Sequence, residues 1–345
     1  MANLKGLTGL ANLGNTCFLN SCMQVLSNTN ELNTLFNNKK NVLVEKLKNK
    51  DDKLYSSALL LNEWIELKDL MWRKNCIISP GKFVKNIQTI AGQKDRDIFT
   101  GWAQNDLPEF LLFVFESFNE ALSSKVSVVI SGNVKNETDK LAKKCYNMVK
   151  TLYEKEYSPL LDLFYGISVT TITNKNGNLL STVPEPFMML SLPLPLEKNL
   201  TLESCFDLYC RKETLDGDNA WLNEKTNKKE DVNKGILFWS LPNILVIDLK
   251  RFTNTNKKRQ DSIEIPLNNL DLSSYVIGYK RRSYVYDLYA VCNHEGGCSG
   301  GHYTANIRKE DDKWYNFNDT TVKEIKRNHV ISTKAYCLFY KKKHI

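Results

Sequence analysis

The sequence has no hydrophobic stretch long enough to cross a membrane, since no run in it approaches the roughly 18 apolar residues of a transmembrane helix. Its first residues, MANLKGLTGL, lack the long apolar core of a secretory signal. The nine cysteines are an odd number and do not form the dense framework of a disulfide-rich protein. We therefore expect reduced thiols and an intracellular protein, located in the cytoplasm, the nucleus or both.

The positive charge of the chain does not indicate nucleic-acid binding as a main role. The net charge of +8 is diffuse, and its densest parts lie at 37–50, at 257–260 and in the terminal YKKKHI. These stretches lack the interleaved aromatics and the motifs of nucleic-acid-binding domains, so we interpret them as solvated faces. A hydrophobic content of 42% over 345 residues is ample for the core of a large globular protein.

The first half of the sequence has the hydrophobic spacing of helices. In QNDLPEFLLFVFESFNEAL (104–122) the helix start can be predicted in detail. Asp106 is expected as the N-cap, with Pro108 in the first turn and Glu109 completing a capping box. The polar segment around 37–53 is expected to be a loop or an exposed helix end. The other predicted helices lie at 17–28, 55–72, from 79–87 onward and near 137–155.

The second half changes to β-branched and proline-punctuated segments, which are typical of strands and sheet edges. A helical first half followed by a β-rich second half predicts an α+β fold in one multi-lobed domain. The strand-like segments are 160–173, 179–196, 243–252, 281–294, 300–308, 313–318 and 334–343.

Cys17 lies where a polar LGNT turn gives way to an apolar helical pattern. A thiol at that point faces the backbone N–H groups of a helix start, and an adjacent imidazole would favour the nucleophilic thiolate. A buried structural cysteine behind an ordinary N-cap is the alternative, because sequence position does not distinguish the two. A catalytic thiol also needs a base elsewhere in the chain.

Two of the four histidines bracket a glycine-rich hairpin, NHEGGCSGGHYTANI. His302 follows two glycines and opens a strand, which would hold its ring rigidly and leave room for a substrate. His294 is the alternative base, and a surface-loop histidine is the structural alternative for both. A third residue should orient the imidazole through its other nitrogen, and KWYNFNDTTV offers Asn318 and Asp319.

These motifs resemble those of the ubiquitin-specific protease family, the papain-like deubiquitinating enzymes. GLANLGNTCFLNSCMQVL (9–26) is similar to the family's cysteine box, and GGHYTANIRKEDDKWYNFND (300–319) to its histidine box. Between them, QNDLPEFLLFVFESF, EPFMMLSLPLPL and LPNILVIDLKRF are similar to further family segments and stand in the family's order. The resemblance covers nearly the whole chain.

The resemblance implies a cysteine-type ubiquitinyl hydrolase that cleaves the bond after the C-terminal glycine of ubiquitin in protein conjugates. Ubiquitin and ubiquitinated proteins are the expected partners. A non-catalytic ubiquitin-binding relative and a protease for a ubiquitin-like modifier are the alternatives, and the intact catalytic set argues against the first. The implied fold is a single papain-like catalytic domain (1–345) with a helical thumb (about 1–158), fingers and connections (159–242) and a β-rich palm (243–345).

The family pattern also implies a role for each motif residue. Cys17 would attack the carbonyl to form an acyl-enzyme, and His302 would take the thiol proton and return it to the leaving amine. Asn318 stands at the third position of the triad, and Asp319 follows as a supporting acid. Asn12 matches a residue that donates to the oxyanion, with a turn asparagine as the structural alternative.

Three further residues match substrate-binding positions of the family. Asp106 matches an aspartate that binds the extended ubiquitin tail, a role as well supported as that of a helix cap. Gly300 and Gly301 would keep the channel narrow enough for a Gly-Gly terminus while excluding larger side chains.

The chain departs from the family at its fingers. Many relatives hold zinc there with two CxxC pairs, whereas this chain has Asn174, Gly177, Asn223 and Thr226 at the matching positions. We therefore expect no metal and no cofactor, and a fingers lobe held by strand pairing and apolar packing. The expected packing residues are Phe164, Tyr165, Leu179, Leu180, Trp221 and Phe238. Asp248 also replaces a histidine that is usual in the LKRF segment.

Overall fold

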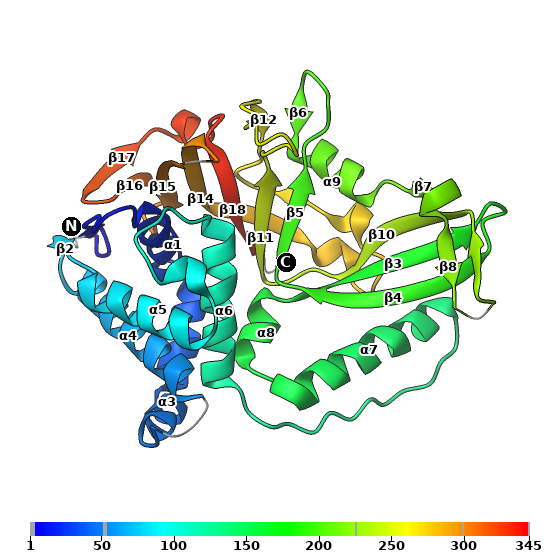
Figure 1. The fold of residues 1–345 in the computed structure, drawn as a ribbon, viewed down its shortest axis with the longest axis horizontal. Helices are drawn as coiled ribbons and strands as arrows, with labels where there is room; N and C mark the ends of the chain where they lie inside the picture. The colour runs from blue at the N-terminus through cyan, green and yellow to red at the C-terminus, as the bar shows by residue number, and fades with distance from the viewer. Residues whose placement is uncertain (1–3, 51–53, 225, 299, 344–345) are drawn as a thin grey trace.

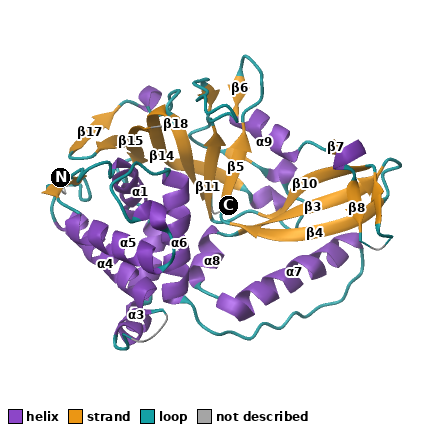
Figure 2. Ribbon diagram, in the orientation of Figure 1, coloured by secondary structure: helices purple, strands orange, loops and turns teal. Residues whose placement is uncertain are grey.

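A helical lobe from the first half of the chain packs against a large β-sheet from the second half (Figure 1). A second sheet extends away from the first on the side opposite the helical lobe, with helix α7 beneath it (Figure 2). The computed structural model describes residues 4–50, 54–224, 226–298 and 300–343. This arrangement confirms the predicted α+β fold with a thumb, a palm and fingers.

The helices follow the predicted hydrophobic spacing closely. The polar segment around 37–53, expected to be a loop or an exposed helix end, holds the end of one helix at Asn38 and a further short helix over Lys40–Leu47, with Leu43 as its buried anchor. Residues 51–53 of that prediction lie outside the described residues. The helices are α1 (Cys17–Ser27), α2 (Asn30–Asn38), α3 (Lys40–Leu47), α4 (Tyr55–Arg73), α5 (Gly81–Gln93), α6 (Leu107–Leu122), α7 (Glu137–Glu156), α8 (Pro159–Phe164) and α9 (Leu202–Cys210).

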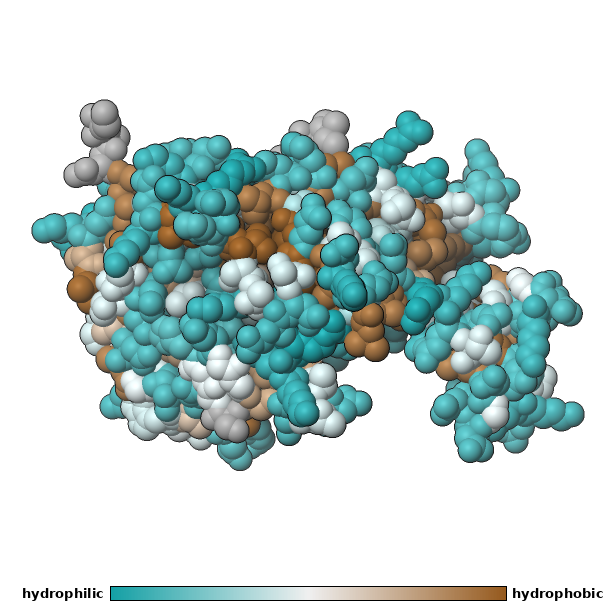
Figure 3. Space-filling model, turned by 90° about the horizontal axis from the view of Figure 1, so that it is seen from above, coloured by the Kyte–Doolittle hydropathy of each residue, from teal (hydrophilic) through white to brown (hydrophobic). Residues whose placement is uncertain are grey.

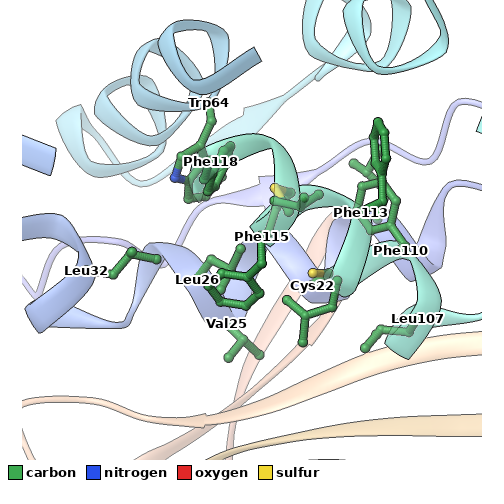
Figure 4. Close-up of a cluster of buried hydrophobic side chains, with 14 of the residues drawn as sticks. Cys22, Val25, Leu26, Leu32, Trp64, Leu107, Phe110, Phe113, Phe115 and Phe118 are labelled. Carbon is green, nitrogen blue, oxygen red and sulfur yellow. The ribbon is translucent and has the colours of Figure 1, made fainter. Parts of the chain in front are cut away.

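Helix α1 lies in the middle of the helical lobe, and all 11 of its residues are buried. Its apolar side chains meet those of α6 (Figure 4), where Phe18 and Phe110 pack edge to face with ring centroids 5.1 Å apart. Its polar residues need partners because an unpaired buried amide is costly. The Gln24 side chain accordingly donates to the Thr8 carbonyl at 2.7 Å.

Helix α6 begins where the sequence predicts, with Asp106 at the N-cap and a proline in the first turn. The predicted capping box is wrong, because the Asp106 side chain makes no cap hydrogen bond. Its carboxylate instead accepts a hydrogen bond from the Tyr303 hydroxyl at 3.0 Å. A hydrogen bond between the helical lobe and the palm thus takes the place of the predicted helix cap.

The palm is an eight-stranded sheet with the order β17-β16-β15-β14-β18-β11-β5, to which β13 is added at β14. Hydrophobic side chains cover both faces of this sheet. One face packs against the helical lobe, and the other packs against α9 and the base of the fingers. The strands are β5 (Met189–Pro193), β11 (Ile244–Lys250), β13 (Leu270–Asp271), β14 (Val285–Gly297), β15 (Gly300–Arg308), β16 (Trp314–Asn318), β17 (Thr321–Ile325) and β18 (Ala335–Lys342).

The fingers are a four-stranded sheet with the order β4-β3-β10-β7 and a separate hairpin. The prediction of a strand over 160–173 is wrong at its start, because Ser158 caps the short helix α8 before β3 begins. The strands are β3 (Gly166–Asn174), β4 (Leu179–Phe187), β7 (Glu213–Leu215) and β10 (Val232–Ser240), and the hairpin is β8 (Trp221–Asn223) with β9 (Lys228–Glu230). Two short pairs, β1 (Gly9–Leu10) with β2 (Ile77–Ile78) and β6 (Leu200–Thr201) with β12 (Ile263–Glu264), complete the fold.

Hydrogen bonds hold the two turns that contain the positions expected to lack zinc ligands. Asn223 Nδ2 and Thr226 Oγ1 both donate to Glu230 Oε1, at 2.8 and 3.2 Å. In the other turn, Asn174 Oδ1 accepts from the Asn178 N–H at 2.9 Å. Among the described residues, no cluster of three or more histidine, cysteine or acidic side chains could hold a metal ion.

The apolar packing of the fingers differs from the predicted set. Phe238 is fully buried and packs on Phe187 and Tyr209, as a core residue should. Leu179 is 60% exposed, and Phe164 belongs to the core of the helical lobe, so neither of these packs in a fingers core.

Most of the face seen in Figure 3 is hydrophilic, and hydrophobic residues show in a band across its middle. No helix in the described part of the chain combines the length and the apolar character needed to cross a membrane.

We expect the purified protein to contain no stoichiometric zinc, because hydrogen bonds to Glu230 and Asn174 hold the turns that a metal would otherwise join. Elemental analysis measures the metal content, and a chelator should change neither the melting temperature nor the activity. One tightly bound zinc ion per chain, lost together with stability on chelation, would contradict this expectation.

Candidate active site

The turn before α1 is organised by Asn12. Its Oδ1 accepts hydrogen bonds from the backbone N–H groups of Gly14 at 3.1 Å and Thr16 at 3.0 Å. Gly14 and Asn15 both have positive φ, at 106° and 57°, a conformation that glycine and asparagine tolerate best. The turn therefore fixes the start of α1, at which Cys17 is the first helical residue.

Cys17 is only 2% exposed, and its burial raises the pKa of the thiol above its usual range. The negative charge of Asp319 also raises this pKa, whereas the backbone N–H groups of Tyr303 and Phe18 lower it. The helix-start amides thus favour the thiolate, as the sequence predicts, but burial outweighs them in the free protein. The sulfur is held as a thiol beside the backbone of Tyr303, the residue that follows His302.

His302 and Asn318 lie together, as predicted, on the neighbouring strands β15 and β16. His302 Nε2 is 2.7 Å from Asn318 Oδ1. Because an amide oxygen only accepts hydrogen bonds, Nε2 carries the proton and Nδ1 is left with a free lone pair. In this tautomer the ring can accept a proton through Nδ1.

His294 has a different environment and does not resemble a catalytic base. It is 4% exposed, and its ring stacks on Tyr303 with centroids 4.5 Å apart. The Lys258 ammonium is 2.9 Å from its Nδ1. Burial and this positive charge lower the pKa of His294 to about 4, so it is neutral at physiological pH. His294 therefore has a structural role and supports the position of Tyr303.

The Asp319 carboxylate joins the palm to the helical lobe. Asn12 Nδ2 donates to its Oδ2 at 3.0 Å, and Asn20 Nδ2 donates to its Oδ1 at 2.8 Å. The Asp319 carbonyl also accepts from the Leu10 N–H at 2.9 Å. The palm turn after β16 is thereby fastened to both the Asn12 turn and α1.

Sequence reasoning missed Asn20. This residue is 2% exposed and lies almost one helical turn after Cys17, on the same side of α1. A polar residue at that spacing inside an apolar helix was the available signal, since a buried amide needs partners.

A cavity of about 240 Å³ lies between the two lobes beside the hairpin glycines. A side chain at Gly301 would overlap His294 Nε2, and one at Gly300 would meet Gln104 Oε1 at 2.8 Å. Gln104, which the sequence analysis also missed, accepts a hydrogen bond from the Gly301 N–H. The residues that line this channel include Asp106, Phe252, Gly300, Gly301, Tyr303 and Tyr336.

The positions of Gly300, Gly301 and Asp106 fit the predicted channel. The two glycines and Asp106 line the same cavity, and the carboxylate of Asp106 accepts the hydrogen bond from Tyr303. Burial raises the pKa of Asp106, and hydrogen bonds from Tyr336 and Tyr303 partly offset that rise. Packing of the wall itself already requires glycine at these two positions.

Replacing the two histidines should separate catalysis from stability. His302→Ala should abolish turnover without lowering the melting temperature, because the ring is partly exposed and serves as the proton acceptor. His294→Ala should destabilise the fold by about 1–3 kcal/mol, because it leaves a cavity behind Tyr303. Turnover and thermal unfolding of each variant provide the measurement, and loss of the chemical step in His294→Ala alone would move the base to His294.

Sequence comparisons relate the chain to a described family. A family model described as ubiquitin carboxyl-terminal hydrolase matches residues 8–340. Ubiquitin carboxyl-terminal hydrolase Usp2 of Drosophila melanogaster is 34% identical over 98% of this chain and 35% of its own length. Human ubiquitin carboxyl-terminal hydrolase 2 is 34% identical over 97% of this chain and 55% of its own length. The chain thus spans about a third and about half of these two relatives.

Two further similarities extend the comparison. The probable ubiquitin carboxyl-terminal hydrolase R319 of Acanthamoeba polyphaga mimivirus is 28% identical over 98% of this chain and 90% of its own length. Among solved structures, a chain of the SAGA DUB module Ubp8/Sgf11/Sus1/Sgf73 bound to monoubiquitin superposes with a TM-score of 0.72. It is 22% identical, and the match covers 100% of this chain and 71% of that one. A second structure of the module, bound to ubiquitin aldehyde, also superposes with a TM-score of 0.72.

Proposed function

Because the chain belongs to the ubiquitin carboxyl-terminal hydrolase family, we propose that it is a thiol-dependent deubiquitinase. It hydrolyses the bond after the C-terminal glycine of ubiquitin in protein conjugates. The observation that carries this proposal is the placement of the Cys17 thiol beside the strand that holds His302, whose ring is hydrogen-bonded to Asn318. A non-catalytic relative has no need of this paired arrangement.

The reaction begins with a thiol, because burial keeps Cys17 protonated in the free protein. His302 accepts the thiol proton at Nδ1 while the sulfur attacks the carbonyl carbon. The resulting imidazolium then protonates the leaving amine, and an acyl-enzyme thioester remains on Cys17. Water, deprotonated by the same imidazole, hydrolyses the thioester and regenerates the thiol.

Asn318 keeps the ring in the productive tautomer by accepting from Nε2. Its amide is neutral, so it stabilises the imidazolium less than a carboxylate would. Asp319 contributes from a different position. Its carboxylate holds Asn12 and Asn20 instead of the imidazole.

Asn12 is placed to donate to the oxyanion. Its Nδ2 carries two hydrogens, of which one is used by Asp319 at 3.0 Å. The second can reach the carbonyl oxygen as it becomes negative, and such a donor contributes about 3 kcal/mol to transition-state stabilisation. The hydrogen bonds of Asn12 within its turn leave this hydrogen free, so the turn role is compatible with the proposed donor role.

The channel beside Gly300 and Gly301 supports a substrate tail that ends in small residues. The close packing of Gly300 against Gln104 and of Gly301 against His294 supports a narrow channel, which would suit an extended Gly-Gly segment better than one with larger side chains. Asp106 provides the charged group for the tail further along the channel. A ubiquitin-like modifier with the same terminus is the second candidate substrate, because these features recognise the tail and not the folded body.

We also propose a cell compartment on the basis of the cysteines. All nine are free thiols in the structure, which suits a reducing compartment, and we place the protein in the cytoplasm, the nucleus or both. Residues 1–345 act as one catalytic unit in this proposal, with the thumb at about 1–158, the fingers at 159–242 and the palm at 243–345.

A ubiquitin that carries a small C-terminal electrophile should label Cys17 and no other cysteine. The exposed thiols Cys76 and Cys298 provide an internal control, because a small haloacetamide should alkylate them without need of the channel. Intact-mass analysis of the wild type and of Cys17→Ala is the measurement. Ubiquitin labelling at an unchanged rate in Cys17→Ala would rule out Cys17 as the nucleophile.

A further inference from the structure

Strand β15 separates two cavities at the catalytic residues. Side chains alternate between the faces of a strand, so Gly301 and Tyr303 face the tail channel whereas His302, Thr304 and Asn306 face the other side. The channel beside Gly301 takes the acyl part of the substrate, according to the proposed function. The leaving amine must therefore depart on the side of His302, which protonates it.

A second cavity, of about 280 Å³, lies on that side. It is lined by His302 and Asn318 at one end and continues over the outward side chains of β14, β15 and β16. The strand register places Asn293 opposite Thr304, and Asn316 opposite Asn306, so these side chains share one face. The cavity is thus continuous with the catalytic base.

The lining of this cavity is polar, with Ile325 as an apolar exception. Its floor is ordered by hydrogen bonds: Asn316 Nδ2 donates to Asn306 Oδ1 at 2.8 Å, and Asn306 Nδ2 donates to the Val330 carbonyl at 2.8 Å. Lys334 and Glu295 form an ion pair across 2.7 Å at the rim. The tail channel, with its aromatic and glycine walls, has a different chemistry.

One lining residue points to a ligand. Asn293 is 6% exposed, and its Oδ1 is buried with no hydrogen-bond partner among the described residues. Buried amide oxygens of folded proteins are generally paired, so a rotation of this side chain toward the cavity that it lines would give its oxygen a donor. A peptide N–H supplies such a donor.

We propose that this cavity binds the polypeptide on the amine side of the isopeptide bond, namely the substrate lysine and the main chain next to it. The inference rests on the proposed function and adds the second half of the substrate. The lysine ε-amine lies at His302 Nδ1, and the amide and hydroxyl groups of the cavity pair with the main chain that follows. The volume suits about one or two residues, close to the lower limit of small-molecule sites at about 300 Å³.

Filling the cavity should distinguish substrates by their leaving group. Ser332→Trp places a bulky ring at its exposed mouth, and Thr304→Phe fills its floor. Each variant should cleave a ubiquitin joined to the lysine of a short peptide with kcat/KM lowered by about 10-fold or more. Labelling by ubiquitin with a small C-terminal electrophile should be unchanged, because that probe has no lysine peptide to place.

Thr333→Trp is the matched control, since Thr333 is exposed next to Ser332 but does not line the cavity. It should cleave the lysine-peptide conjugate at the wild-type rate, and melting temperatures show whether each variant is folded. If Ser332→Trp and Thr304→Phe cleave this conjugate normally, the cavity does not bind the leaving side. If labelling falls in parallel with cleavage, these residues support His302 itself, and the assignment is also overturned. A wild type that neither labels nor cleaves would instead refute the proposed function.

Discussion

The arrangement of the site depends on one carboxylate. Asp319 follows the last residue of β16, in a turn with positive φ, and receives amide donors from Asn12 and Asn20 of the helical lobe. The nucleophile, its turn and α1 belong to that lobe, whereas His302 and Asn318 belong to the palm. Both hydrogen bonds go to a charged acceptor, and the one from Asn20 is also partly buried, so they are stronger than neutral ones. They fix how the two halves of the catalytic machinery meet.

Burial of α1 also fixes the position of the nucleophile relative to the palm. A helix with every residue buried has little freedom to shift, so Cys17 is held by packing on all sides. Burial has a chemical consequence, because it raises the pKa of the thiol and leaves deprotonation to His302. In the proposal above, the polar cavity beside His302 binds the amine side of the substrate, so both sides of the scissile bond contact the same strand.

Local patterns predicted most of the fold, because the helices and the palm strands follow from hydrophobic spacing. Spacing alone offered Asn318 and Asp319 alike as partners of His302, and the resemblance to the family implied Asn318, which the structure places against the ring. Contacts between distant segments could not be predicted. Asn20 and Asp319 are 299 residues apart, and the Asp106 side chain accepts a hydrogen bond from Tyr303 instead of capping its own helix. The effect of burial on the pKa of Cys17 could not be predicted either, because the cost of burying a charge depends on the packed surroundings. The start of α8 was recoverable, since Ser158 before a proline is a helix-start signal.

A double-mutant cycle on Asn20 and Asp319 tests the central claim, that their hydrogen bond connects the two halves of the site. The quantity is kcat/KM for a ubiquitin conjugate in Asn20→Ala, Asp319→Ala and the double variant, with melting temperatures as the control for folding. The account predicts that the double variant is little worse than Asp319→Ala alone, with a coupling free energy of about 1 kcal/mol or more. Losses that simply multiply, with no coupling between the two positions, would contradict it.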